Sequence, residues 1–103
     1  MNKWDARFLE LARVIAGWSK DPGTGCGAIV VRDRRILGAG FNGLPAGIED
    51  RDELLQDRGR KLMLTIHAED NAILNAVVPV RGATLYVWPM PPCAHCAARI
   101  IQV

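Results

Sequence analysis

Two short motifs with metal-binding side chains set the strongest limit on how this chain can fold: "HAED" (67–70) and "PCAHC" (92–96). Between them lies "ATLYVW" (83–88), whose β-branched and aromatic residues are typical of a strand. One imidazole and two thiols are donors that zinc prefers. If they share one ion, the segments before and after the strand must meet at the same end of the fold. The three candidate zinc ligands are His67, Cys93 and Cys96.

Glu69 follows His67 by two positions, and this spacing limits where the two side chains can meet. Side chains two apart on a helix point about 200° apart, because a turn holds 3.6 residues. His67 and Glu69 therefore converge only at a site off the N-terminal end of a helix. Free N–H groups at helix starts also favour thiolates and hydroxide. A zinc with three protein ligands keeps a fourth position for water, which indicates a catalytic site with Glu69 as proton carrier.

A structural zinc is the main alternative for the same motifs, and it needs a fourth protein ligand. Cys26 and His95 are the candidates. Cys26 begins an apolar run and is expected to be a small core residue, whereas His95 lies between the two thiols and should point away from their ion. A redox role for the Cys-x-x-Cys pair is disfavoured because no thioredoxin-like pattern surrounds it. The catalytic interpretation is therefore favoured.

Length and charge favour a single globular domain over residues 1–103. The chain has 13 Lys and Arg against 11 Asp and Glu, a net charge of +2 that is too small to predict nucleic acid as a partner. Charged residues interrupt the N-terminal segment, so it predicts neither a signal peptide nor a membrane span. Three cysteines argue against a disulfide framework, and we expect a cytoplasmic protein.

Periodicity predicts the element order α-β-β-α-β-α. Apolar residues from Trp4 to Trp18 at spacings of three and four residues predict a first helix, with Trp4, Phe8 and Trp18 in the core. The other predicted elements are strands at Cys26–Val31, Ile36–Asn42 and Ala83–Trp88, helices at Ile66–Val77 and after Pro92, and a helical turn at Asp52–Asp57. Such alternation predicts helices packed on a sheet.

With these motifs, the sequence resembles the cytidine/deoxycytidylate deaminase superfamily, in which His-x-Glu and Pro-Cys-x-x-Cys form the zinc site. It is most similar to the deoxycytidylate (dCMP) deaminases through "SKDPGTGCGAIVV", "ILGAGFNGLPAG", "HAEDNAILNA" and "ATLYVWPMPPCAHCAARIIQ". The resemblance implies a three-layer α/β cytidine deaminase-like fold, with a mixed sheet and helices on both faces. The family continues beyond "RIIQ", so we expect the domain to lack the family's C-terminal strands.

The resemblance also implies a reaction, the zinc-dependent hydrolysis of dCMP to dUMP and ammonia. It implies that Asn42 meets the sugar and pyrimidine, that Thr24 lies near the phosphate, and that the backbone of Ala68 faces the pyrimidine edge. Two alternatives stay open: deamination of cytidine, cytosine or a tRNA adenosine, and an inactive zinc-binding module used in assembly. The charged stretch Glu49–Lys61 is expected to be a surface loop, with a lid role left open.

A homo-oligomer is predicted from the third strand. This strand should pair with the first strand on one side and leave its other edge bare, and isolated proteins avoid bare apolar edges. We expect the interface to include this edge or the third helix.

Overall fold

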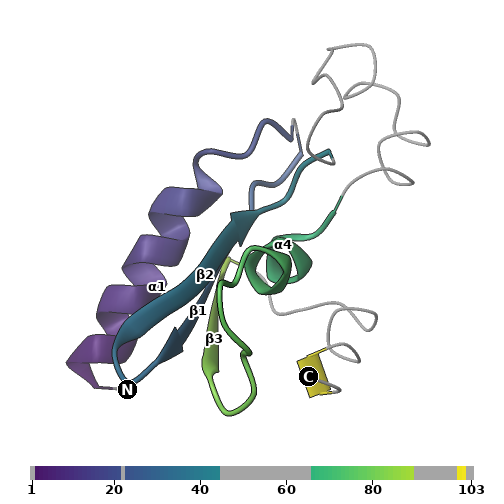
Figure 1. Ribbon diagram of the computed structural model, residues 1–103. Helices are drawn as coiled ribbons and strands as arrows, with labels where there is room; N and C mark the ends of the chain where they lie inside the picture. Colours follow the sequence, from purple (N-terminus) through teal and green to yellow (C-terminus); the bar gives the residue numbers. More distant parts are fainter. Residues whose placement is uncertain (1, 22, 45–65, 90–99, 102–103) are drawn as a thin grey trace.

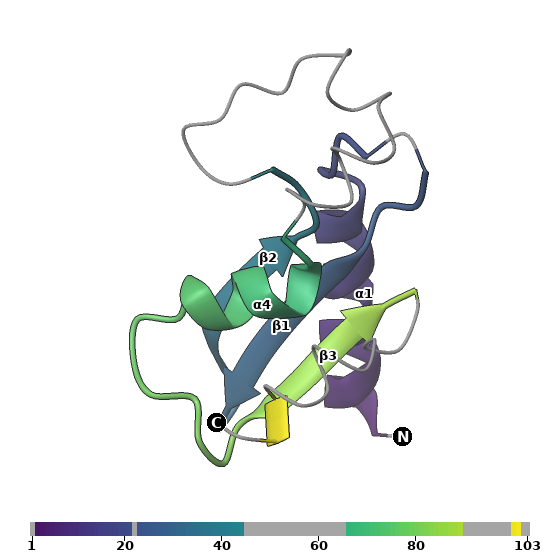
Figure 2. The same cartoon turned by 90° about the vertical axis from the view of Figure 1, so that its right-hand side faces the viewer.

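A three-stranded sheet with one helix on each face forms the core of the protein (Figure 1). The computed structural model describes residues 2–21, 23–44, 66–89 and 100–101, and the account below is restricted to them. The strand order is β2-β1-β3, and β1 is antiparallel to both neighbours. Turned by 90°, the molecule has α4 in front of the sheet and α1 behind it (Figure 2). The elements are α1 (Lys3–Ala16), β1 (Gly27–Arg32), β2 (Arg35–Phe41), α4 (Ala68–Leu74) and β3 (Thr84–Trp88).

Local sequence explains where α1 begins and which face it buries. Asn2 caps the helix in a reciprocal capping box with Asp5, which satisfies two backbone N–H groups at the helix start. Phe8, Ala12 and Ala16 are the buried residues of α1, at a spacing of four. The helix ends at Ala16 with Gly17 as its C-cap, before the predicted end at Trp18. Trp18 was predicted to be a core residue, and this is wrong: it is 61% exposed because it lies beyond the helix.

Strand β1 is buried on both faces, as its continuous apolar run predicted. Ile29 and Val31 pack with Phe8 and Ala12 under α1. Ala28 and Val30 point the other way and pack with Ala68 and Ala72 of α4. Successive side chains of a strand point to opposite faces, so this strand joins the two helical layers. The predicted pairing of the third strand with the first is confirmed by the β1–β3 register.

The turn between β1 and β2 is formed by Asp33 and Arg34, with φ values of 53° and 63°. Two consecutive positive φ angles match the two-residue hairpin turns whose twist suits antiparallel strands. The hairpin strands agree with prediction within one residue at each end: β1 begins at Gly27 rather than Cys26, and β2 ends at Phe41 rather than Asn42.

Helix α4 is shorter than predicted, and the difference has a physical cause at each end. Ile66 was assigned to the helix but forms an isolated β-bridge with Gly43, through hydrogen bonds of 2.8 and 3.1 Å. At the other end, Asn75 is the C-cap, so Val77 lies outside the helix. Val77 was predicted to face inward, which is wrong: it is 85% exposed.

Glycines in β2 let α4 lie directly on the sheet. A Cβ at Gly38 would lie 2.3 Å from the Ala72 carbonyl oxygen, and one at Gly40 would lie 2.5 Å from the Ala72 nitrogen. No side chain fits at either position without moving the helix backbone. Alternate glycines in the strand therefore fix the height of α4 above the sheet.

Three predictions fall partly or wholly outside the described residues: the helical turn at Asp52–Asp57, the loop Glu49–Lys61 and the third helix. Of the third helix, Ile100 and Ile101 are described, and both have helical backbone. Within the described ranges, none of the helices is long and apolar enough to span a membrane.

Candidate functional site

Three segments meet at the end of the sheet opposite the β1–β2 hairpin. They are the loop that leads into β1, the residues after β2, and the start of α4, all toward the top of Figure 1. The β-bridge between Gly43 and Ile66 ties the second segment to the third. A hydrogen bond of 3.3 Å from the Asn42 N–H to the Cys26 carbonyl ties it to the first. This end carries the predicted residues Thr24, Asn42, His67, Ala68 and Glu69.

Helix α4 begins inside the "HAED" motif, as the spacing of His67 and Glu69 predicted. His67 is the N-cap with an extended backbone, and Ala68 is the first helical residue. His67 is exposed, whereas Ala68 and Glu69 are only 1% and 5% exposed. The motif therefore places an exposed histidine at the N-cap of α4 and, two residues later, a carboxylate that is almost fully shielded from bulk water.

Cys26 lies close enough to this buried carboxylate to interact with its charge. It is half-buried and packs against the cluster of Ala28, Val30, Ala68 and Ala72. Burial raises the pKa of the Cys26 thiol above its ordinary value, and the negative charges of Glu69 and then Asp21 raise it further. Cys26 is therefore a neutral thiol near pH 7. Its contact with the core agrees with the prediction of a small packing residue.

Asn42 is buried, and its side-chain amide binds the loop before β1. Its Oδ1 accepts a hydrogen bond of 2.9 Å from the Cys26 N–H. Its Nδ2 donates to the Thr24 carbonyl oxygen at 3.0 Å and to Asp21 Oδ2 at 3.4 Å. Asn42 and Thr24, two of the predicted substrate contacts, are thus brought together, with the Thr24 residue exposed.

Sequence reasoning missed the two polar residues that complete this arrangement. Ser19 Oγ donates a 2.8 Å hydrogen bond to the Asn42 carbonyl oxygen and accepts one of 3.2 Å from the Asp21 N–H. Asp21 Oδ1 accepts a 2.8 Å bond from the Gly23 N–H. The available signal was a Ser and an Asp in a turn next to a strand, since both residues bind nearby backbone groups in turns.

Cys93 and Cys96 lie outside the described residues, so the structure brings together only one of the three predicted zinc ligands with Glu69. Among the described residues, no group of three His, Cys, Asp or Glu side chains could hold a metal. The donor chemistry nevertheless fits zinc, because His67 offers an exposed imidazole and the chain carries two thiols at Cys-x-x-Cys spacing.

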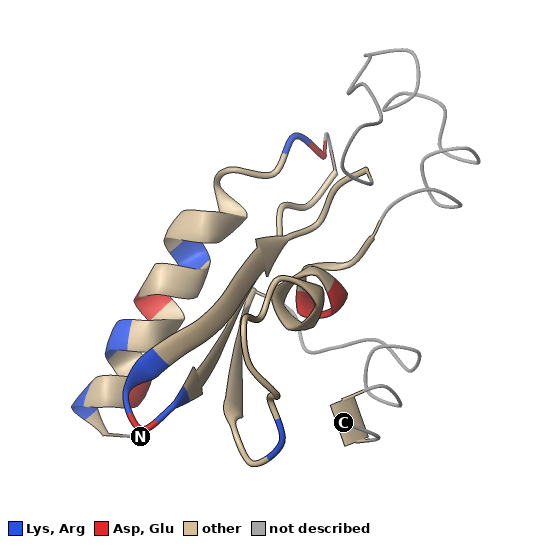
Figure 3. Ribbon diagram, in the orientation of Figure 1, with Lys and Arg blue, Asp and Glu red and all other residues tan. Residues whose placement is uncertain are grey.

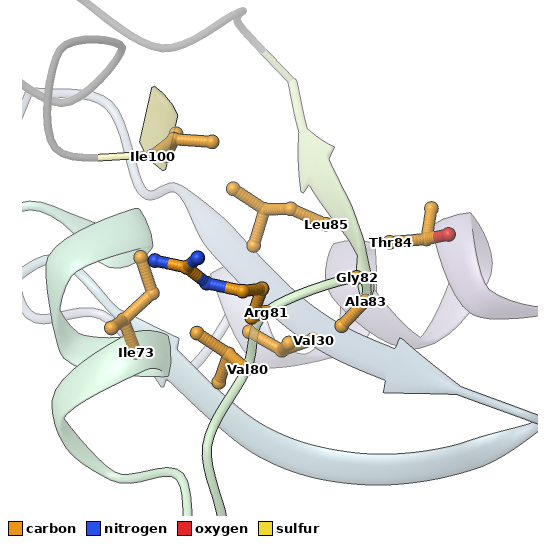
Figure 4. Close-up of a pocket in the computed structure, with 9 residues that line it drawn as sticks. All are labelled: Val30, Ile73, Val80, Arg81, Gly82, Ala83, Thr84, Leu85 and Ile100. Atoms are coloured by element: carbon orange, nitrogen blue, oxygen red, sulfur yellow. The ribbon is translucent and has the colours of Figure 1, made fainter. Parts of the chain in front are cut away.

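A cavity of about 90 Å³ lies elsewhere, at the start of β3 (Figure 4). None of the predicted site residues lines it. Polar and apolar atoms share its wall about equally, and the Arg81 side chain extends across it toward Ile100 and Ile73. The lining residues are Val30, Ile73, Val80, Arg81, Gly82, Ala83, Thr84, Leu85 and Ile100.

The described charges are unevenly distributed along the sheet (Figure 3). Most of the described Lys and Arg residues lie in or beside the β1–β2 hairpin and in the first turns of α1, whereas Lys20 lies beside Asp21 at the opposite end. Acidic residues of α4 lie at the candidate site, where Glu69 is buried. The site therefore holds a shielded carboxylate apart from the basic end of the molecule.

Comparisons with known proteins give a consistent result. The family model for the cytidine and deoxycytidylate deaminase zinc-binding region matches residues 2–103. An uncharacterized deaminase in the luxG 3′ region of Aliivibrio fischeri is 42% identical over 102 residues, which cover 99% of this chain and 68% of the relative. The deoxycytidylate deaminase of Pongo abelii is 39% identical over 108 residues, which cover 97% of this chain and 60% of that protein.

A solved structure supports the same fold. The dCMP deaminase of cyanophage S-TIM5, in complex with dCMP and dUMP, superposes with a TM-score of 0.83 at 25% identity, and the match covers 99% of this chain and 76% of that chain. The predicted cytidine deaminase-like α/β fold is thereby confirmed. The chain spans only part of its relatives: 68% of the length of the Aliivibrio fischeri protein and 60% of the length of the Pongo abelii protein. With the family model matching nearly its whole length, the chain belongs to the cytidine and deoxycytidylate deaminase family.

Proposed function

We propose that this protein hydrolyses dCMP to dUMP and ammonia with a zinc cofactor. The single observation that carries the proposal is the pairing at the start of α4 of an exposed His67 with a Glu69 that is 5% exposed. A carboxylate shielded from water, two residues after an imidazole that could bind a metal, suits proton transfer at a metal-assisted hydrolytic site. The deoxycytidylate deaminases among the relatives, and the cyanophage enzyme in complex with dCMP and dUMP, support this substrate.

His67, Cys93 and Cys96 would hold the zinc ion. When bound, zinc supplies the Lewis acidity that makes water a nucleophile near neutral pH. These ligands leave Glu69 outside the metal's coordination set, so its carboxylate is available to carry protons.

Glu69 is the proposed acid and base. Its carboxylate accepts a proton from the attacking water and donates it to the pyrimidine ring nitrogen next to the amino-bearing carbon. It then takes the second water proton to the departing amino group, which leaves as ammonia. One water is consumed, and the C–N bond is replaced by a C=O bond. Proton transfer of this kind contributes about 10²- to 10⁴-fold to the rate.

Asn42, Thr24 and Ala68 are the proposed substrate contacts. Asn42 would bind the sugar, the exposed Thr24 would lie near the 5′-phosphate, and the Ala68 backbone would face the pyrimidine edge. The hydrogen bond between Asn42 Nδ2 and the Thr24 carbonyl supports this assignment, because it holds the sugar and phosphate contacts next to each other. A nucleotide is therefore the preferred substrate class.

The decisive experiment measures ammonia release from dCMP, deoxycytidine, dCTP, cytidine, cytosine and adenosine by purified, zinc-loaded protein. We expect the highest kcat/KM for dCMP, and a marked loss when the 5′-phosphate is removed. Equal rates on dCMP and deoxycytidine would show that the nucleotide assignment is wrong. Zinc binding without turnover of any of these compounds would favour the assembly module instead.

Cytoplasmic location and a homo-oligomer stay predictions. Within the described part of the sheet, β3 pairs with β1 and has no second strand beside it, which is the arrangement on which the oligomer prediction depends. Light scattering of the purified protein at micromolar concentration would measure the assembly.

A further inference from the structure

We infer that Asp21, held in place by Ser19, is a positioning residue that fixes the amide of Asn42 for substrate binding. The inference rests on the proposed function and extends it to two residues outside the proposed catalytic and binding set. It starts from the hydrogen-bonding capacity of one side chain. An Asn amide has two N–H donors and a carbonyl oxygen with two lone pairs.

Both donors of Asn42 are already used. One N–H group of Nδ2 points to the Thr24 carbonyl oxygen at 3.0 Å, and the other to Asp21 Oδ2 at 3.4 Å. Oδ1 accepts the Cys26 N–H at 2.9 Å. These three contacts leave one lone pair of Oδ1 unused. This lone pair can accept a hydrogen bond only from a group that donates.

These partners also prevent the amide from turning over. A flip of 180° would point Oδ1 at the Thr24 carbonyl and the Asp21 carboxylate, which are both acceptors. It would also point the NH₂ group at the Cys26 N–H, which is a donor. Every contact would become repulsive, and Asn42 is only 9% exposed, so water could not compensate. Because the Asp21 carboxylate is a charged acceptor, it favours the observed orientation of the amide more strongly than a neutral acceptor would.

Ser19 and Gly23 hold the carboxylate where Asn42 needs it. Ser19 Oγ accepts the Asp21 N–H at 3.2 Å and donates to the Asn42 carbonyl oxygen at 2.8 Å, so one hydroxyl joins both residues. The Gly23 N–H occupies the other carboxylate oxygen of Asp21 at 2.8 Å. The orientation of the Asn42 amide therefore depends on Asp21 and Ser19, which need not touch the substrate.

This arrangement predicts what Asn42 recognises. A fixed Oδ1 selects a ligand group that donates a hydrogen bond, and a sugar hydroxyl is such a group. Loss of one neutral hydrogen bond costs about 0.5–1.5 kcal/mol, which corresponds to roughly 2- to 12-fold in kcat/KM. We therefore expect dCMP to exceed its 3′-deoxy analogue, 2′,3′-dideoxycytidine monophosphate, by roughly that factor.

The test compares both substrates in variants of the positioning residues. Asp21→Ala should raise KM for dCMP and leave kcat within about twofold. The preference for dCMP, which is the ratio of kcat/KM on dCMP to kcat/KM on the dideoxy analogue, should fall close to 1. Ser19→Ala should act in the same direction, and Ser19→Thr, which keeps the hydroxyl, should restore the preference. Glu10→Ala is the matched control, because it removes an exposed carboxylate from α1. A merely structural role would lower activity on both substrates and keep their ratio, and this result would overturn the inference.

A second measurement separates this inference from the proposed function. The two side-chain amide protons of Asn42 can be followed by NMR without any substrate. Asp21→Ala should shift one of them strongly, and Glu10→Ala should shift neither. If the wild-type protein deaminates no nucleotide but this shift is seen, the proposed function fails while the positioning of Asn42 holds. Unchanged Asn42 resonances in Asp21→Ala would refute the positioning itself.

Discussion

The buried side chains on the two faces of the sheet differ in size. Under α1 the cluster contains Phe8, Ile29 and Val31, with Trp4 and Tyr86 at its margin. The aromatic rings contact one another: the Phe8 and Tyr86 centroids are 5.4 Å apart, and those of Trp4 and Phe8 are 6.2 Å apart. Large rings bury much apolar surface, so this face supplies a large share of the hydrophobic stabilisation.

The buried residues under α4 are smaller, and larger side chains such as Leu37, Ile73 and Leu85 are only partly buried there. Ala28, Ala68 and Ala72 are buried there with Val30, and the strand beneath the helix carries Gly38 and Gly40. Small side chains contribute less apolar burial, but they let the helix backbone approach the strand closely. The buried Glu69 lies on this helix, and the buried Asn42 lies at the end of the glycine-bearing strand. The comparison indicates that one face provides stability and the other sets the position of the polar site.

Replacement of Glu69 should have the largest effect and should leave both faces intact. Glu69→Gln keeps the shape of the side chain but cannot carry a proton as a carboxylate does. We expect kcat on dCMP to fall by about 10²- to 10⁴-fold, with zinc content and melting temperature close to wild type. Metal analysis, circular dichroism and ammonia release measure these three quantities. Equal turnover by Glu69→Gln and wild type would refute the proposed role.

Truncation of Phe8 should produce the largest loss of stability. Phe8 is 6% exposed and touches two other rings, so Phe8→Ala removes the centre of the α1 cluster. We expect a decrease of about 3–5 kcal/mol in the free energy of unfolding, measured by denaturant titration. Where the variant folds, its kcat should stay near wild type.

Leu11→Ala is the matched control on the same helix, because Leu11 is 41% exposed. Its effect on stability should stay below about 1 kcal/mol. Similar losses in the two variants would contradict the assignment of the aromatic cluster as the main source of stability.

A methyl group under α4 should disturb the site and stability together. In Gly40→Ala the new Cβ would meet the Ala72 nitrogen at 2.5 Å and the Asn71 Cβ at 2.6 Å, so the helix must move away from the strand. Overpacking of this kind costs about 1–3 kcal/mol. Because the helix carries Glu69, we also expect kcat to fall, unlike in Phe8→Ala.

Gly17→Ala serves as the control for added volume. The nearest atom, the Val14 carbonyl oxygen, would lie 3.2 Å from its Cβ, and Gly17 has a helical φ of −66°. We expect little change in stability or activity. If Gly40→Ala keeps full kcat, the close approach of α4 does not position the site.

The parts of the fold that were predictable from the sequence are those in which local pattern and burial agree. The continuous apolar run of β1 located a buried strand within one residue, and the pattern around His67 and Glu69 located a helix start within two. Errors arose where contacts between distant segments decide the outcome. Ile66 fits a helix pattern, but its pairing with Gly43 takes it out of the helix.

The candidate site was predictable only in part for the same reason. The motif residues could be found because their types and spacing match a known chemistry. Ser19 lies 23 positions from Asn42 in the sequence, and Asp21 lies 21 positions from it. No local pattern shows which distant group a side chain in a turn will reach. Gly38 and Gly40 did carry a signal, since alternate glycines in a strand indicate a close approach by another backbone.

The smallest predicted effect concerns a polar contact at the margin of the aromatic face. Tyr86, the single tyrosine of the chain, donates a 2.6 Å hydrogen bond to Asp5 Oδ1. This bond raises the pKa of Tyr86 above its ordinary value near 10, and burial and the Asp5 charge raise it further. The folded state therefore holds the phenol proton more tightly than the unfolded state does. The resulting stabilisation is complete below about pH 10 and is lost as the pH rises through the folded-state pKa.

An absorbance titration of the phenolate reports this one residue without labelling. We expect its midpoint above 10 in the wild-type protein, and a shift back toward 10 in Asp5→Asn, which removes the carboxylate but keeps a similar shape. Alkaline loss of stability should then begin at a similar pH but be smaller in the variant. Titration of wild-type Tyr86 at or below 10 would show that the Asp5 bond does not form in solution. Glu69 lies on α4 and Asn42 follows β2, whereas Asp5 lies on α1. Asp5→Asn should therefore leave kcat on dCMP unchanged. This result would confirm that polar groups on the two faces of the sheet act independently.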